Sequence, residues 1–134
     1  MARADKWIAL EAYVSDLALL LDLAGWEITI SREPAEPDAH ADIDPHAQRR
    51  SAELRVEAGF YALSAERQRL IIAHELGHLV HARVDRVVEN LEDTLGKVGW
   101  AILEPNYTDA AERTVEHWAR LVAPYLPLPS LPKG

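Results

Sequence analysis

The stretch Leu70-Ile-Ile-Ala-His-Glu-Leu-Gly-His-Leu-Val80 guides the interpretation of the rest of the chain. Its centre, from His74 to His78, is an HExxH motif set in an apolar run. On a helix, residues four positions apart lie one above the other, so His74 and His78 present two imidazoles on one face. Glu75 lies about 100° further round the helix and points beside that pair. The stretch therefore predicts a helix that carries two convergent imidazoles and one adjacent carboxylate.

Other residues support a helix at this position. Ser64 precedes the run as a predicted N-cap, and Glu66 places an acid in the first turn. At 100° per residue, apolar side chains fall on both sides of the helix, which predicts a central, buried element. Two core histidines satisfied by hydrogen bonds are the structural alternative to a ligand pair. Leu70 and Ile71 share the histidine side with His81, whereas Ile72, Leu76 and Leu79 lie on the other side.

The HExxH spacing is typical of zinc enzymes. Two imidazoles grip one Zn²⁺, and the glutamate between them takes a proton from a zinc-bound water. We therefore expect a zinc-dependent hydrolase with His74 and His78 as ligands and Glu75 as general base. The chain has no cysteine, so any metal must be held by nitrogen and oxygen atoms.

Composition narrows the functional classes. A chain of 134 residues with 49% hydrophobic residues predicts one folded domain over 1–134. A net charge of −8 argues against nucleic-acid partners. No apolar run approaches the roughly 18 residues of a membrane span, and acids interrupt the first helix where a signal peptide would be apolar. We therefore expect no membrane partner and a cytoplasmic protein.

The chain reads as an α+β fold. Apolar residues at helical spacing predict a first helix that ends at Gly25, and alternating apolar residues predict strands. The strands are expected to form a small, antiparallel sheet between the first helix and the HExxH helix. A free edge strand beside the site could hold an extended peptide. The predicted elements are a helix at 5–24, strands at 26–30, 39–43 and 51–57, a loop at 99–108, a last helix at 109–123 and an extended, proline-rich tail from about 124.

A third metal ligand must come from elsewhere, because catalytic zinc sites commonly use three protein ligands. Asp109, Glu112 and Glu116 lie at i, i+3 and i+7 on one stripe of the last predicted helix. Ala119 and Ala123 continue this stripe with small side chains, which leaves room for a neighbouring helix. A solvated acidic face is the alternative explanation.

An HExxH motif followed by a helix with acids and small residues on one stripe resembles the gluzincin metallopeptidases, and within them the small ImmA/IrrE type. In this alignment Glu112 takes the ligand position, Glu116 stands where Asn or Asp is usual, and Trp118 stands where Phe is usual. Glu116 would then orient a histidine through its free ring N–H; in an alternative frame Glu116 is itself the third ligand. Val115 stands where Ala is usual, Ala119 matches the second Ala of the family pattern, and Val122-Ala123-Pro124 resembles the family's Leu-Leu-x-Pro ending.

The resemblance implies a minimal zincin-like domain that cleaves a peptide or protein substrate, including a repressor-type regulator. It is also compatible with a phage or prophage origin. A zinc-binding regulatory or interaction module with little general proteolytic activity is the alternative function. His81 is expected beside the site or on the surface, and Tyr107 as a residue that could polarise a substrate carbonyl. The metzincin third histidine is missing, because Val84 and Asp85 stand at its place.

Overall fold

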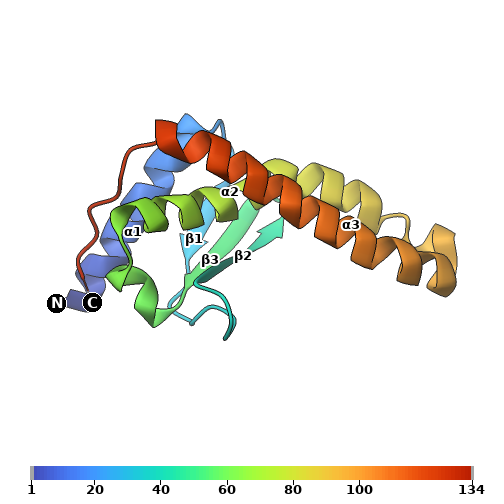
Figure 1. Ribbon diagram of the computed structural model, residues 1–134, viewed down its shortest axis with the longest axis horizontal. Helices are drawn as coiled ribbons and strands as arrows, with labels where there is room; N and C mark the ends of the chain where they lie inside the picture. Colours follow the sequence, from blue (N-terminus) through green and yellow to red (C-terminus); the bar gives the residue numbers. More distant parts are fainter. Residues whose placement is uncertain (1, 134) are drawn as a thin grey trace.

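A computed structural model describes residues 2–133 and shows an α+β fold in which three helices accompany a three-stranded sheet (Figure 1). The fold class expected from the sequence is confirmed. None of the helices in this range is long and apolar enough to cross a lipid bilayer. In chain order the elements are α1 (Ala2–Leu20), β1 (Glu27–Ile30), β2 (Ala41–His46), β3 (Ser51–Val56), η1 (Ala58–Ala62), α2 (Ala65–Glu89), α3 (Glu92–Val122) and η2 (Ala123–Tyr125).

Helix α1 forms along the apolar stripe that its sequence predicts. Leu10, Val14 and Leu17 are buried in the core at intervals of three and four residues. The helix ends at Leu20, earlier than expected, because Asp22 takes a left-handed conformation with φ of 61°. The predicted stop at Gly25 is therefore wrong by about one turn.

The sheet has the strand order β1-β3-β2, with β3 in the centre. Strands β2 and β3 are antiparallel as expected, whereas β1 pairs with β3 in parallel, so the sheet is mixed. Alternate residues of β3 are buried, which shows that one face of the sheet is covered and the other is open to solvent. The second strand, expected at 39–43, instead runs from Ala41 to His46 and includes Pro45. An edge strand tolerates proline, since its outer N–H has no partner to lose.

Helix α2 carries the HExxH motif and begins where the sequence predicts. The Ser64 side chain accepts a hydrogen bond from the Arg67 backbone N–H at 3.2 Å, which confirms the N-cap. Ile72 and Leu76 are fully buried in the core. The buried Gln68 amide donates to the Phe60 carbonyl at 3.1 Å and fixes η1 against the start of α2. These contacts hold the motif helix firmly against the sheet.

The connection expected at 99–108 is helical. Helix α3 already begins at Glu92, breaks at Gly96 with φ of 73° and ψ of 177°, and then continues to Val122 through Pro105. The expectation that the last helix begins at 109 is therefore wrong. Gly96 absorbs the break because it tolerates a positive φ. Pro105 has no backbone N–H, so the helix passes through it without the hydrogen bond that this residue would otherwise donate.

Helices α2 and α3 form an antiparallel hairpin whose far end extends beyond the sheet (Figure 1). The tail returns along the other side of the molecule. After η2, the tail is extended as expected, and the Tyr13 hydroxyl donates to the Pro127 carbonyl at 2.8 Å. The Arg69 guanidinium also donates to the Leu126 carbonyl at 3.0 Å. The tail is thereby attached to both α1 and α2.

Candidate metal centre

The His74 and His78 imidazoles converge with the Glu112 carboxylate between α2 and α3. One candidate ligand atom from each of the three residues lies within 4.8 Å of the others. The Nε2 atom of His74 is 2.7 Å from Oε1 of Glu112, and Nε2 of His78 is 3.4 Å from Oε2. The two imidazole rings are 5.0 Å apart at an angle of 74°. The HExxH histidines and the acid placed at the ligand position thus share one site.

Glu116 contacts the opposite side of the His74 ring. Its Oε2 atom is 2.6 Å from Nδ1 of His74, and its Oε1 atom accepts a hydrogen bond from Arg120 at 2.9 Å. Burial raises the pKa of Glu116, but the hydrogen bonds from His74 and Arg120 outweigh burial and hold the pKa below its usual value. Glu116 is therefore an anion that fixes the ring orientation of His74 through the nitrogen facing away from Glu112.

These contacts test whether a cation fits the site. A neutral His74 that donates its Nδ1 proton to Glu116 leaves the Nε2 lone pair facing the Glu112 carboxylate. Two acceptors 2.7 Å apart need either a second ring proton or a cation that binds both of them. Burial lowers the pKa of His78, which favours the neutral imidazole that binds metals. Two nitrogens and one carboxylate oxygen form a donor set of the kind that catalytic zinc uses, so the residues fit a divalent cation.

Gly77 lets α3 approach closely enough to bring Glu112 into this site. A Cβ atom at Gly77 would lie 2.9 Å from Cε3 of Trp118 and 2.9 Å from Cγ1 of Val115, closer than real contacts allow. Val115 and Ala119 are buried at this crossing. Gly77, inside the HExxH motif, therefore permits the close packing of α3 against α2.

Glu75 lies beside the histidines but faces away from solvent, at 7% exposure. Burial, reinforced by the charges of Glu112 and Asp42, raises the pKa of Glu75 to about 8. A carboxyl whose pKa is tuned close to neutrality suits proton transfer in both directions. Its position next to the three candidate ligands is the position that the motif predicts.

A second polar cluster lies one turn further along α2. Asp85 accepts a hydrogen bond from the Tyr107 hydroxyl at 2.6 Å, and the same oxygen is 2.8 Å from Nδ1 of His81. Burial and the contact with Asp85 raise the pKa of Tyr107, so the phenol stays neutral. The expectation that His81 lies beside the site agrees with this arrangement. The Tyr107 hydroxyl donates its hydrogen to Asp85, so in this structure that hydrogen is not available to polarise a substrate carbonyl.

The three candidate ligands separate two small hollows. One, of about 240 Å³, is bounded by His74, Glu75 and Glu116, and by Ala41 at the start of β2 with His40 just before it. Arg67 and Arg120 also line it. The other, of about 280 Å³, touches His78 and Glu112 on the side of Trp100 and Tyr107. Ligand could therefore reach the cluster from both sides.

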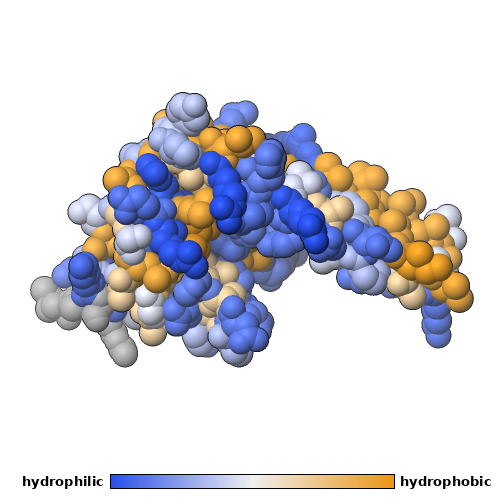
Figure 2. All heavy atoms as spheres, in the orientation of Figure 1, coloured by the Kyte–Doolittle hydropathy of each residue, from blue (hydrophilic) through white to orange (hydrophobic). Residues whose placement is uncertain are grey.

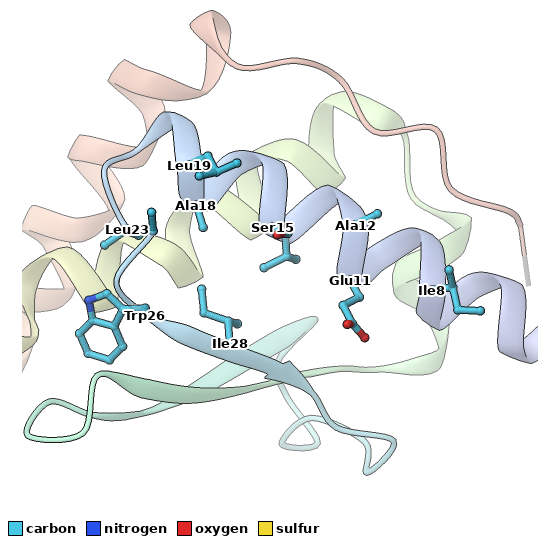
Figure 3. A pocket seen from close by; sticks show the side chains of 11 residues that line it. Ile8, Glu11, Ala12, Ser15, Ala18, Leu19, Leu23, Trp26 and Ile28 are labelled. Atoms are coloured by element: carbon cyan, nitrogen blue, oxygen red, sulfur yellow. The ribbon is translucent and has the colours of Figure 1, made fainter.

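A larger groove of about 460 Å³ lies elsewhere, between α1 and β1 (Figure 3). It is lined mainly by apolar side chains, among them Ile8, Leu19, Trp26 and Ile28, with Glu11 at one side. None of its lining residues belongs to the histidine and glutamate cluster. This groove is therefore separate from the α2–α3 crossing, where the candidate ligands lie.

Several other acids and histidines lie outside the cluster. Asp109 pairs with Arg113 at 2.9 Å on the exposed side of α3, although it shares the acidic stripe. His46 lies near Asp44, and His40 lies near Glu57 at the rim of the smaller hollow. Sequence reasoning missed the contact of Arg120 with Glu116. The i, i+4 spacing of these two residues was the available signal.

Comparisons of the chain with protein-family models, with curated proteins and with solved structures found no match.

Proposed function

We propose that this protein is a zinc-dependent metallopeptidase that uses His74, His78 and Glu112 as metal ligands. The observation that carries this proposal is the convergence of the three donor atoms within 4.8 Å, beside a buried carboxylate on the same helix. Zn²⁺ bound there would supply a Lewis acid that polarises a peptide carbonyl and lowers the pKa of water toward about 7. The motif's resemblance to the ImmA/IrrE-type gluzincins supports the same function.

Glu75 acts as the general base in this proposal. It accepts a proton from the attacking water and returns it to the leaving amine nitrogen as the peptide C–N bond breaks. A cation in the site would favour its ionised form, because an opposite charge stabilises a carboxylate and offsets burial. Glu116 keeps the His74 ring in the orientation that directs Nε2 toward Glu112.

The substrate in this proposal is an extended peptide segment. Strand β2 is an edge of the sheet, and its first residue, Ala41, lines the hollow that touches His74 and Glu75. Main-chain pairing along β2 would bring a scissile bond beside Glu75 without requiring a deep pocket. A flexible segment of a protein, including a repressor-type regulator, meets this requirement better than a rigid surface.

Metal content and peptide cleavage test the proposal together. Wild-type protein loaded with zinc and then dialysed should retain about one ion per chain, whereas His78→Ala and Glu112→Ala should retain almost none. Asp109→Ala is the matched control, because Asp109 is an exposed acid on the same helix that contacts Arg113. Unchanged zinc in Glu112→Ala would contradict the ligand assignment.

Glu75→Gln separates binding from chemistry. This variant should keep zinc but lose cleavage of a mixed peptide library, which a chelator should also abolish in the wild type. Turnover by the metal-loaded variant at the wild-type rate would contradict the role of Glu75. A wild-type protein that holds zinc and leaves every peptide intact would instead be a zinc-binding regulatory or interaction module.

A further inference from the structure

The smaller hollow beside the candidate ligands contains a positive charge that the fold leaves unbalanced. His74 and Glu75 line this hollow of about 240 Å³, and so do Arg67 and Arg120. Arg120 pairs with Glu116 at 2.9 Å. The Arg67 guanidinium is exposed and forms no ion pair with any residue that the structure describes. Arg67 therefore brings an unpaired cation to a hollow that adjoins the candidate metal centre.

The position of Arg67 on its helix is unfavourable for a cation. Arg67 is the third residue of α2, and the N-terminal turn of a helix is the positive end of its dipole, where an anion is favoured and a cation is not. The contact with Ser64 uses the backbone N–H of Arg67 and leaves the side chain free. A residue that opposes a local preference without a compensating contact is typical of a functional position.

The spacing along α2 places Arg67 within reach of a bound substrate. Arg67 and His74 are seven residues apart, so they lie on nearly the same side of the helix, about 10 Å apart along its axis. An extended peptide advances about 3.3 Å per residue. A substrate group within about three residues of the bond beside His74 can therefore meet the Arg67 guanidinium.

The two hollows that flank the candidate ligands differ in charge. Asp85, Glu89 and Glu104 line the hollow on the His78 side, which has no arginine or lysine. The hollow with Arg67 has two arginines, although the whole chain has a net charge of −8. A substrate anion is therefore attracted to one hollow and repelled by the other.

The surface over this part of the molecule is polar. In Figure 2 hydrophilic side chains dominate over the first half of α2 and the neighbouring part of α3, whereas apolar side chains gather at the far end of the hairpin. Polar contacts are therefore the main means of recognition beside the candidate metal centre.

The acids of the same hollow do not cancel the charge of Arg67. Glu116 is balanced by its contacts with His74 and Arg120. Burial raises the pKa of Glu75 to about 8, so without a metal this group is mostly uncharged at neutral pH. When the site holds a divalent cation, that cation balances the ionised Glu75.

The chemistry of the hollow selects a carboxylate as the substrate group. A planar guanidinium donates two parallel hydrogen bonds to a carboxylate, and such charge-assisted bonds are stronger than neutral ones. Leu70 and Ile71 add an apolar wall. The hollow is smaller than the roughly 300–1,000 Å³ of sites that enclose a whole small molecule. It therefore suits one residue of an extended substrate.

We propose that Arg67 determines specificity by binding a substrate carboxylate, from an acidic side chain or from the C-terminus, in the hollow beside Glu75. This inference rests on the proposed peptidase function and names its substrate class. The substrates are peptides that carry a carboxylate within about three residues of the cleaved bond. Arg67 does not contact the reacting atoms, and it acts by positioning the substrate.

A peptide library in two forms tests the proposal and separates the two sources of carboxylate. Zinc-loaded wild type is incubated with a mixed library that has amidated C-termini and with the same library that has free C-termini, and mass spectrometry identifies the products. Enrichment of Asp or Glu near the cleaved bonds of the amidated library assigns the carboxylate to a side chain. Cleavage near the end that requires a free C-terminus assigns it to the terminus. Cleavage without either preference would overturn the proposal.

Substitution of Arg67 should change selectivity and leave the basal activity in place. Arg67→Gln should lower kcat/KM for the preferred peptides by about tenfold, the loss expected from one charge-assisted hydrogen bond, and should leave peptides without a nearby carboxylate unchanged. Arg67→Glu should shift the preference to Lys or Arg at the same position, because the charge of the hollow is then reversed. A structural role for Arg67 would instead affect all peptides alike.

Arg83→Gln is the matched control for these variants. Arg83 is also an exposed arginine of α2 that forms no ion pair with a described residue, but it lines neither hollow beside the candidate ligands. Its selectivity should equal that of the wild type. Zinc content and thermal melting verify that each variant is folded. An Arg67→Glu variant that is folded and keeps the wild-type preference would overturn the proposal.

Binding without turnover separates this inference from the proposed activity. Immobilised, zinc-loaded Glu75→Gln protein should retain carboxylate-bearing peptides of the two libraries at least tenfold more strongly than the others, and a further Arg67→Gln substitution should remove this difference. If the wild type cleaves peptides with and without carboxylates alike, the peptidase function stands and the role of Arg67 is refuted. If the wild type cleaves nothing but retention through Arg67 persists, the peptidase function is refuted and the carboxylate site stands.

Discussion

Among single residues, Glu75 shows most clearly how stability and chemistry conflict in this protein. A carboxyl at 7% exposure without a cationic partner is unfavourable in the ionised form, and its pKa rises accordingly to about 8. A buried acid with a raised pKa beside two histidines is the type of perturbed group that functional sites contain.

The raised pKa of Glu75 predicts how the metal-free protein responds to pH. The folded protein binds the Glu75 proton more tightly than the unfolded chain does. The contribution of this proton to the free energy of unfolding is therefore complete below pH 4.5 and disappears as the pH rises through about 8. Glu75→Gln removes the titration. In the presence of a chelator, its melting temperature should exceed that of the wild type by several degrees at pH 8 and by much less at pH 4.5.

Glu53→Gln provides the control for this measurement, because Glu53 is exposed on the central strand. Its effect on the melting temperature should be small at both pH values. If Glu75→Gln raised the melting temperature equally at both pH values, Glu75 would not titrate between them.

Substitution of Glu116 should affect zinc binding less than substitution of a metal ligand. Glu116→Gln should still bind zinc, but with an affinity lower by about tenfold to a hundredfold, because the amide supports the His74 ring less strongly than a carboxylate. Competition with a zinc-binding dye measures this change, and Asp109→Asn on the same helix should leave the affinity unaltered. Complete loss of zinc in Glu116→Gln would favour the alternative frame, in which Glu116 is the third ligand.

At the level of elements, the crossing of α2 over α3 builds the site. The HExxH helix is held by its cap at Ser64 and by the sheet, but the third ligand depends on how closely α3 approaches at Gly77. The helix that carries Glu112 is much longer than expected, since it runs through Pro105 and the segment predicted as a loop. Its length also creates the projecting hairpin.

Gly77→Ala should therefore disturb both the crossing and the site. A methyl group 2.9 Å from the Val115 and Trp118 side chains forces α3 outward, and overpacking of this kind costs about 1–3 kcal/mol. We expect a lower free energy of unfolding in urea and weaker zinc binding in the same variant. Gly25→Ala is the control, because a Cβ there meets only the end of the flexible Arg50 side chain. Wild-type stability and affinity in Gly77→Ala would refute the close-approach argument.

Across the whole molecule, the tail connects the two ends of the chain. The Tyr13 hydroxyl on α1 donates to the Pro127 carbonyl, 114 residues away. Burial raises the pKa of Tyr13 to about 12, and the charge of Arg69 opposes this effect. The neutral phenol is therefore the form that holds the tail in place.

Tyr13→Phe should lower the free energy of unfolding by about 1 kcal/mol near neutral pH, the usual contribution of one such hydrogen bond. Between pH 10 and about 12 the wild type should lose this advantage, because the unfolded chain ionises its tyrosine before the folded protein does. Urea unfolding at both ends of that range measures the difference. Tyr125→Phe is the control, since Tyr125 is 89% exposed. A Tyr13→Phe deficit that persists undiminished at the alkaline end would contradict the pKa argument.

The sequence by itself determined the local features: the capped HExxH helix, the apolar stripe of α1, the alternation in β3 and the acids on one stripe of α3. Each of these depends on neighbours within about one or two turns, where spacing and propensity decide. Only the tertiary structure decided the parallel pairing of β1 with β3 and the contacts of Glu112 and Glu116 with opposite sides of one imidazole ring. These features depend on contacts between residues far apart in sequence, because packing against a second element overrides local preference.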